Sequence, residues 1–321
     1  MTAPTPESLL HGLVLPLGSL IVFMSISLLV ANILEAMNWT RFLARLAAPL
    51  VRLGRFKDVS GASFSLAFVS GFAANTMLAE SYERGTLSRR ELILANLFNS
   101  MPTYFLHLPT TFSLAAPFLG PVAALYVGLT FLAAILRTAG VVAAGRLFLP
   151  PIPEGCVVCR LDEHKPRTPW EALRKGWHRF QKRIRKVVLI TAPIYTAMYF
   201  ARIWGIFDAV EDFLATHVGS LGFLPPQALS IVAFHLVAET TSGLAAAGAV
   251  LQGGELPARV VVLALLVGNI LSSPMRAFRH QFPYYAGIFK PGLAARLIVY
   301  SQLLRAVSIA LVTAGFAFFS S

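Results

Sequence analysis

The chain has 321 residues, of which 56% are hydrophobic and 13% are charged, and its formal net charge is +12. Soluble domains carry about a quarter charged residues, so this composition excludes a water-soluble enzyme, a disordered chain and a secreted disulfide scaffold. The mean hydropathy of the whole chain is +0.68, which excludes a soluble domain held by a single membrane anchor. The composition therefore predicts a polytopic membrane protein. In such a protein an excess of Lys and Arg is explained first by the enrichment of these residues in cytoplasmic loops, and only then by nucleic-acid binding.

Six apolar segments are long enough to cross a membrane once, which takes about 20 residues. They are 12–36, 88–110, 119–148, 186–208, 257–282 and 290–319. Two further apolar stretches, 61–84 and 227–253, each contain a small polar segment near the centre: Ser70 to Thr76 in the first, Glu239 to Gly243 in the second. Uncovered polar backbone is not tolerated in lipid, so such a break implies burial in protein or a water-lined cavity.

The charges of the loops decide how these two stretches meet the membrane. The linker 146–186 contains eleven Lys and Arg residues and is expected in the cytoplasm, as is the basic stretch 38–58. Both can lie there only if 61–84 enters and leaves at the cytoplasmic face. The acidic loop after 186–208 and the basic residues after 257–282 require 227–253 to be re-entrant from the outside. Both stretches are therefore predicted to be helical hairpins.

The two halves then share one order of elements: a span, an interfacial helix, a hairpin, a helix broken near a proline, and a final span. Three spans in each half is an odd number, so the halves must be inverted relative to each other. The predicted fold is an all-α polytopic membrane protein with an inverted repeat, in the cell's inner (cytoplasmic) membrane. The first repeat is 1–149, a cytoplasmic basic linker with an amphipathic helix is 150–185, and the second repeat is 186–321.

Several short motifs carry a family resemblance. They are the basic run 41–57 leading into Gly71–Thr76, the turn Gly85–Ser88, Asn99–Pro102, the basic helix Trp170–Lys186, and Asn269–Pro274. With them, residues 11–319 resemble the nucleoside-recognition or "gate" family. That family is shared by concentrative nucleoside transporters, spore maturation proteins and the membrane part of bacterial ferrous iron transporters.

The resemblance implies a substrate site, because hairpin tips and unwound helices hold the substrate beside a sodium ion in the nucleoside transporters. The residues that the resemblance assigns to this site are Asn75, Thr76, Asn99, Ser100, Glu239, Thr240, Thr241, Asn269, Ser272 and Ser273. Arg276 directly follows the second broken segment and is the candidate for an anionic group of the substrate. We expect Asn75, Thr76, Glu239, Thr240 and Asn269 to face one another around one cavity.

Four charged residues in apolar surroundings have competing interpretations. Glu239 costs at least about 2.5 kcal/mol in mid-membrane, so it is expected either to couple a proton or cation, or to pair with a buried arginine. Glu80 lies four residues before Arg84 and is expected to form an ion pair on one helix face. Arg137 and Arg305 occupy equivalent places in the final span of each half, which favours a shared structural duty over anion binding.

The cysteines and histidines give weaker indications. Cys156 and Cys159 have metal-like spacing and His164 is near, but a closed zinc site needs four ligands, so a solvated loop is the favoured interpretation. His107, His235 and His280 are lone histidines on apolar faces, for which packing is the ordinary role.

The sequence favours a secondary transporter of a small polar solute, nucleoside-like or anionic, with no cofactor and with sodium or a proton as a compatible coupling ion. Its expected partners are the solute and the lipid bilayer, and the sequence is also compatible with a homo-oligomer. Nucleic acid is not an expected partner. Two alternatives stay open: a permease for ferrous or another inorganic ion, and a non-transporting membrane scaffold subunit. No Ser-His-Asp set or metal-hydrolase motif occurs in the sequence, so no enzyme is expected.

Overall fold

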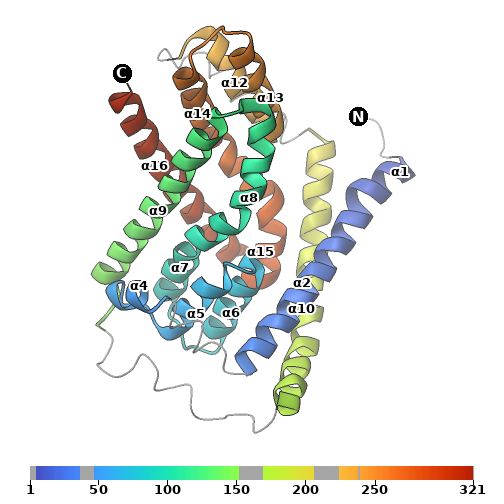
Figure 1. The fold of residues 1–321 in the computed structure, drawn as a ribbon. Helices are drawn as coiled ribbons and strands as arrows, with labels where there is room; N and C mark the ends of the chain where they lie inside the picture. The colour runs from blue at the N-terminus through green and yellow to red at the C-terminus, as the bar shows by residue number, and fades with distance from the viewer. Residues whose placement is uncertain (1–4, 37–46, 152–168, 206–223, 238, 321) are drawn as a thin grey trace.

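The computed structural model describes residues 5–36, 47–151, 169–205, 224–237 and 239–320 (Figure 1). Within these residues every regular element is a helix and there is no strand. The predicted all-α class is therefore confirmed for the part of the chain that the structure describes.

Three helical segments are long and apolar enough to cross a membrane, judged by length and composition. They are α9 (Val122–Phe148), the continuous run Ala258–Phe289 and α16 (Pro291–Phe319). These segments match three of the predicted spans, so the chain is a membrane protein. The predicted spans 12–36 and 186–208 overlap shorter apolar helices, Pro6–Val22 and Val188–Ala197. These two spans and the span 88–110 stay predictions.

The N-terminal helices pack beside the basic helix of the linker. α1 (Pro6–Leu9) and the π-helix η1 (Leu10–Val14) lead into α2 (Leu15–Ala36), which packs along α10 (Figure 1). α10 runs from Pro169 to Ile203 without a break. The predicted amphipathic helix and the predicted span after it are therefore one element.

The stretch 61–84 is not one straight helix. α4 (Ala48–Leu53) precedes α5 (Asp58–Leu66) and α6 (Gly71–Glu83), and α5 packs against α6. The break lies at residues 67–70 and overlaps the predicted segment Ser70–Thr76 only at Ser70. The Ser70 hydroxyl accepts a hydrogen bond from the Ala73 amide and starts α6 there. Asn75 and Thr76 therefore lie inside α6.

The second apolar stretch also contains two helices, α12 (Pro226–Val237) and α13 (Glu239–Gln252), which pack against each other. Residue 238 between them lies outside the described residues. Figure 1 shows the α5–α6 pair at one end of the helical bundle and the α12–α13 pair at the opposite end.

The two helices predicted to be broken differ. α7 (Arg89–Phe98) starts at a capping box between Ser88 and Glu91, and a single residue, Asn99, separates it from α8 (Ser100–Leu119). α14 (Ala258–Arg276) instead continues through Asn269–Pro274, so the break predicted there is wrong.

The irregularity in the second case comes after the proline. Pro274 has no amide hydrogen to donate to the carbonyl of Ile270, four residues earlier. α14 nevertheless continues through Pro274 to Arg276, and the π-helix η2 (Ala277–Gln281) and α15 (Phe282–Phe289) follow it. Asn269, Ser272 and Ser273 are therefore on a regular helix.

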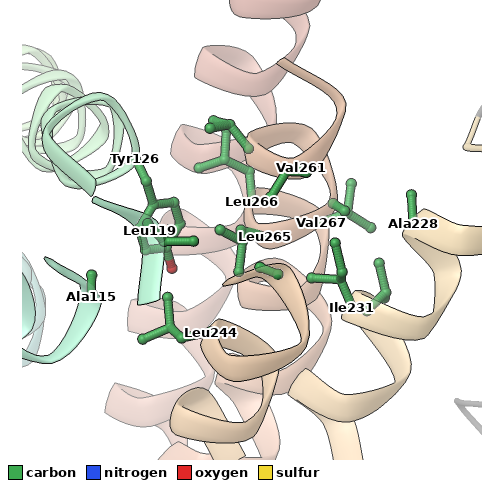
Figure 2. Close-up of a cluster of buried hydrophobic side chains, with 14 of the residues drawn as sticks. Ala115, Leu119, Tyr126, Ala228, Ile231, Leu244, Val261, Leu265, Leu266 and Val267 are labelled. Atoms are coloured by element: carbon green, nitrogen blue, oxygen red, sulfur yellow. The ribbon is translucent and has the colours of Figure 1, made fainter. Parts of the chain in front are cut away.

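The largest buried apolar cluster joins helices of both predicted repeats. Figure 2 shows Leu265 of α14 between Leu119 of α8 on one side and Ile231 of α12 on the other. Smaller clusters join α6 and α7 to α15 and α16, and α4 and α5 to α7 and α9. Residues 1–149 and 186–321 thus contribute to shared cores.

Candidate functional site

A first polar cluster lies where α5, α6, α7 and α15 meet, and we define it as Ser63, Asn75, Asn96, Asn99 and Tyr285. The side-chain amide of Asn96 donates to Asn75 Oδ1 at 2.8 Å and to the Tyr285 hydroxyl at 3.4 Å. The amide of Asn99 donates to Ser63 Oγ at 2.7 Å. All of these groups are neutral, and the hydrogen bonds hold the two-helix unit α5–α6 to α7.

A second polar cluster lies between α8, α9, α14 and α16, and we define it as Tyr104, Tyr126, Arg137, Asn269 and Arg305. The amide of Asn269 donates to the Tyr126 hydroxyl at 3.0 Å. Arg305 Nη2 donates to Asn269 Oδ1 at 3.1 Å. One predicted site residue, Asn269, is thus fixed on both sides by residues that the sequence analysis did not assign to a substrate site.

Arg137 is the least satisfied member of this second polar cluster. Arg137 is only 8% exposed, and its Nε has no hydrogen-bond partner in the described part of the chain. Its charge acts on that of Arg305 and on the Tyr104 hydroxyl. That hydroxyl lies 2.6 Å from Thr130 Oγ1 on α9. Two cations therefore lie close together among neutral groups.

Two further polar contacts lie on the same helices. Ser273 Oγ donates to Gln302 Oε1 at 2.7 Å, which ties a predicted site residue of α14 to α16. His235 of α12 is completely buried, and among the described residues neither ring nitrogen has a hydrogen-bond partner. Gly243 and Gly268 leave room for its ring, since a Cβ on Gly268 would lie 2.9 Å from His235 Cβ.

Several predicted site residues contain a buried polar atom that has no hydrogen-bond partner within the described ranges. These atoms are Thr76 Oγ1, Asn99 Oδ1, Ser100 Oγ and Ser272 Oγ. Leaving a buried polar group unpaired costs about 1–3 kcal/mol, so native proteins rarely do so without water or a ligand. These atoms therefore mark places where a solute could replace the missing partners.

The predicted residues separate into those that the structure places and those that it does not. Asn75 and Asn99 belong to the first polar cluster and Asn269 to the second, and no hydrogen bond between described residues joins the two. The side chains of Glu239, Thr240 and Thr241 lie outside the described residues. The prediction that all of these face one cavity therefore stays a prediction.

The weaker metal prediction falls on residues that are not described. Cys156, Cys159 and His164 lie in 152–168, outside the described ranges. Among the residues that are described, no group of three or more His, Cys, Asp or Glu side chains could hold a metal ion. The predicted pair of Glu80 and Arg84 is confirmed, with Arg84 Nη2 3.0 Å from Glu80 Oε2.

The sequence analysis assigned no substrate role to Ser63, Tyr104, Tyr126, Gln302 or Tyr285. One signal could have revealed part of this group. Tyr126, Thr130 and Arg137 recur on one face of the predicted span 119–148, at spacings of four and seven residues. A polar stripe on an apolar helix indicates a face turned toward protein or water and away from lipid.

The fold and its membrane-length helices define an all-α membrane protein, and comparison with known proteins adds relatives but no activity. No protein-family model matches the chain. Uncharacterized protein MJ0871 of Methanocaldococcus jannaschii is 25% identical over 273 residues, which are 84% of this chain and 83% of the relative.

Two more relatives come from the same archaeon. Uncharacterized protein MJ1556 is 24% identical over 296 residues, 89% of this chain and 90% of the relative. Uncharacterized protein MJ0880 is 22% identical over 310 residues, 94% of this chain and 98% of the relative. No solved structure matches. The similarity covers between 83% and 98% of the length of these archaeal proteins.

Proposed function

We propose that this chain is an integral membrane secondary transporter of a small polar solute, with its site near the middle of the membrane between two helical hairpins and two irregular helices. The observation that carries the proposal is the set of unpartnered buried polar atoms on Thr76, Asn99, Ser100 and Ser272. They lie on elements that the sequence analysis singled out for substrate binding. Polar groups at membrane depth are costly and mark substrate or ion pathways.

The packing of the helices supports an inverted repeat. In the first half α6 packs on α15, which belongs to the second half; in the second half α13 packs on α8, which belongs to the first. The final helices α9 and α16 pack on each other, and each also packs on both α7 and α14. Such an exchange of equivalent contacts is expected when two halves are related by a two-fold axis, as in many transporters.

The positions of the two helix pairs support re-entry from opposite membrane faces. α5–α6 and α12–α13 lie at opposite ends of the bundle in Figure 1. The loop charges predict the same arrangement, with the first pair entering from the cytoplasm and the second from the outside. In alternating-access transporters the site lies between such elements, so that each pair can close one side of it.

Uptake into proteoliposomes tests the proposal. The purified full chain is reconstituted and offered nucleosides, dicarboxylates, phosphate and divalent cations, each with and without a sodium or proton gradient. We expect uptake of at least one polar solute, and we expect Thr76→Val and Ser272→Val to reduce it at least about tenfold, since each alters a site atom.

Two controls make the outcome decisive. Thr110→Val alters an exposed threonine of α8 and should leave uptake unchanged. Uptake of divalent cations alone would favour the ion-permease alternative. A folded, reconstituted protein that moves no offered solute would overturn the transporter proposal and favour the scaffold alternative.

A further inference from the structure

Two arginines lie deep within helices that are long enough to span a membrane. Arg305 stands midway between Pro291 and Phe319, the ends of α16, and Arg137 lies in the middle third of α9. If α9 and α16 cross the bilayer, both guanidinium groups lie near its centre. A cation at that depth is costly and therefore requires a partner or a function.

The expected partner is a carboxylate, and within the described residues neither arginine has one. Arg137 makes no hydrogen bond or ion pair there, and Arg305 is held by the neutral amide of Asn269. The acids with described ion pairs are engaged elsewhere: Glu80 with Arg84, and Glu91 with Lys57.

The two cations also act on each other. Arg137 lies near enough to Arg305 for the two positive charges to repel. The groups around them, Tyr104, Tyr126 and Asn269, are neutral and cannot offset this repulsion. A structural role alone would therefore leave two like charges buried together, whereas an anion between them would remove both the repulsion and the missing hydrogen bonds.

We propose that Arg137 and Arg305 bind an oxyanion, the carboxylate or phosphate group of a small solute, in the second polar cluster. The planar guanidinium fork matches the two oxygens of such a group. One nitrogen of Arg305 is already bonded to Asn269, and Asn269 is in turn bonded to Tyr126. Asn269 and Tyr126 are therefore positioning residues for Arg305. The assignment rests on the proposed transport function, because it names the chemical class of the solute as anionic.

Thermal unfolding of the full chain in detergent tests binding with pairs of probes that differ in charge. One pair is succinate and succinamide, the other a nucleoside 5′-monophosphate and the free nucleoside, and inorganic phosphate is a fifth probe. Ionic strength is held constant with chloride. We expect the anionic member of at least one pair to raise the Tm while its neutral counterpart does not, since a ligand of the folded state stabilises it. A rise in Tm with inorganic phosphate alone would also support the proposal, with the second polar cluster as a binding site for phosphate.

Matched variants locate the effect. Arg137→Gln and Arg305→Gln should each weaken binding of the anion at least about 30-fold, since they remove one side of a buried charged contact. Arg146→Gln and Arg296→Gln change exposed arginines on the same two helices and should leave binding unchanged. Equal losses in all four variants, or equal binding of the neutral probes, would overturn the proposal.

Further measurements separate this inference from misfolding and from a failure of the proposed function. Arg137→Lys keeps the charge but loses the fork, and it should bind more tightly than Arg137→Gln and more weakly than the parent. If the anion binds but no solute enters proteoliposomes, the site stands and the transport function fails. If a neutral solute is transported equally by the parent and by Arg137→Gln, transport stands and the anion site fails.

Discussion

The two polar clusters lie between different sets of helices and are built from different chemistry. In the first, the amide of Asn96 on α7 bonds to Asn75 and Tyr285. In the second, Asn269 on α14 accepts from Arg305 and donates to Tyr126. The first cluster consists of neutral groups and leaves one buried atom, Asn99 Oδ1, without a partner among the described residues. The second contains two cations, one of them without a partner among the described residues.

This difference suggests separate tasks in the proposed transporter. Hydrogen bonds between neutral groups give rigidity, and one unpaired neutral atom costs less than an unpaired charge. A buried cation that lacks a partner is unstable until an anion arrives, so its cost is recovered only in the ligand-bound state. The first cluster is therefore suited to hold the two-helix unit α5–α6 in place and to offer a neutral contact, and the second is suited to bind a charged group.

The largest expected effect concerns α9, the helix that carries Arg137 into the second cluster. Gly145 packs so closely on the loop after α4 that a Cβ would overlap the carbonyl oxygen of Gly54 and lie 3.0 Å from the Phe56 ring. We expect Gly145→Ala to destabilise the protein by about 3 kcal/mol, since the clash is with backbone. Thermal unfolding in detergent measures this. Gly140→Ala, on the same helix with open space around it, should not destabilise; equal effects would show that α9 is not fixed at this contact.

The next effect has the opposite sign. Arg137→Met removes a buried, unpaired charge and keeps the apolar bulk, so the unliganded protein should become more stable by about 2 kcal/mol. Denaturant titration of the parent and the variant without added anion measures the difference. A loss of stability would instead mean that Arg137 is paired inside the protein, and the contrast between the two clusters would disappear.

In the first cluster the matching change should destabilise. Asn96→Leu leaves Asn75 Oδ1 and the Tyr285 hydroxyl without their donor, at an expected cost of about 1.5 kcal/mol. The double variant with Asn75→Leu should cost less than the sum of the single variants, because each removes the same hydrogen bond. Strict additivity in a thermal-unfolding cycle would mean that the two amides do not support each other.

The smallest effect concerns the bond between Ser273 and Gln302, which links α14 to α16 beside the second cluster. A cycle of Ser273→Ala and Gln302→Leu should give a coupling energy of about 1 kcal/mol, the usual worth of one neutral hydrogen bond. Both single variants should still bind the anionic probe, since neither alters an arginine. Loss of binding in Ser273→Ala would extend the site toward Ser273.

Local patterns predicted those features that depend on neighbours in the chain. Hydropathy found the three long apolar helices, and the four-residue spacing of Glu80 and Arg84 predicted their ion pair. The break predicted at Asn269–Pro274 was wrong, because α14 continues through Pro274 to Arg276. The hydrogen bonds of the second polar cluster could not be predicted, since Tyr126 and Asn269 are 143 positions apart.

Composition, periodicity and charge placement by themselves determined an all-α membrane protein and the segments in which polar residues interrupt apolar helices. These properties follow from each segment's own length and polarity, which no packing partner changes. Which polar groups meet was decided by the tertiary structure alone, because it depends on where α9 and α16 pack together. From the sequence, Arg137 and Arg305 are two equivalent arginines that suggest a structural duty; in the fold they are neighbours among neutral groups. A buried charge is defined by its surroundings, so only the fold could show that Arg137 is a buried cation without a partner among the described residues.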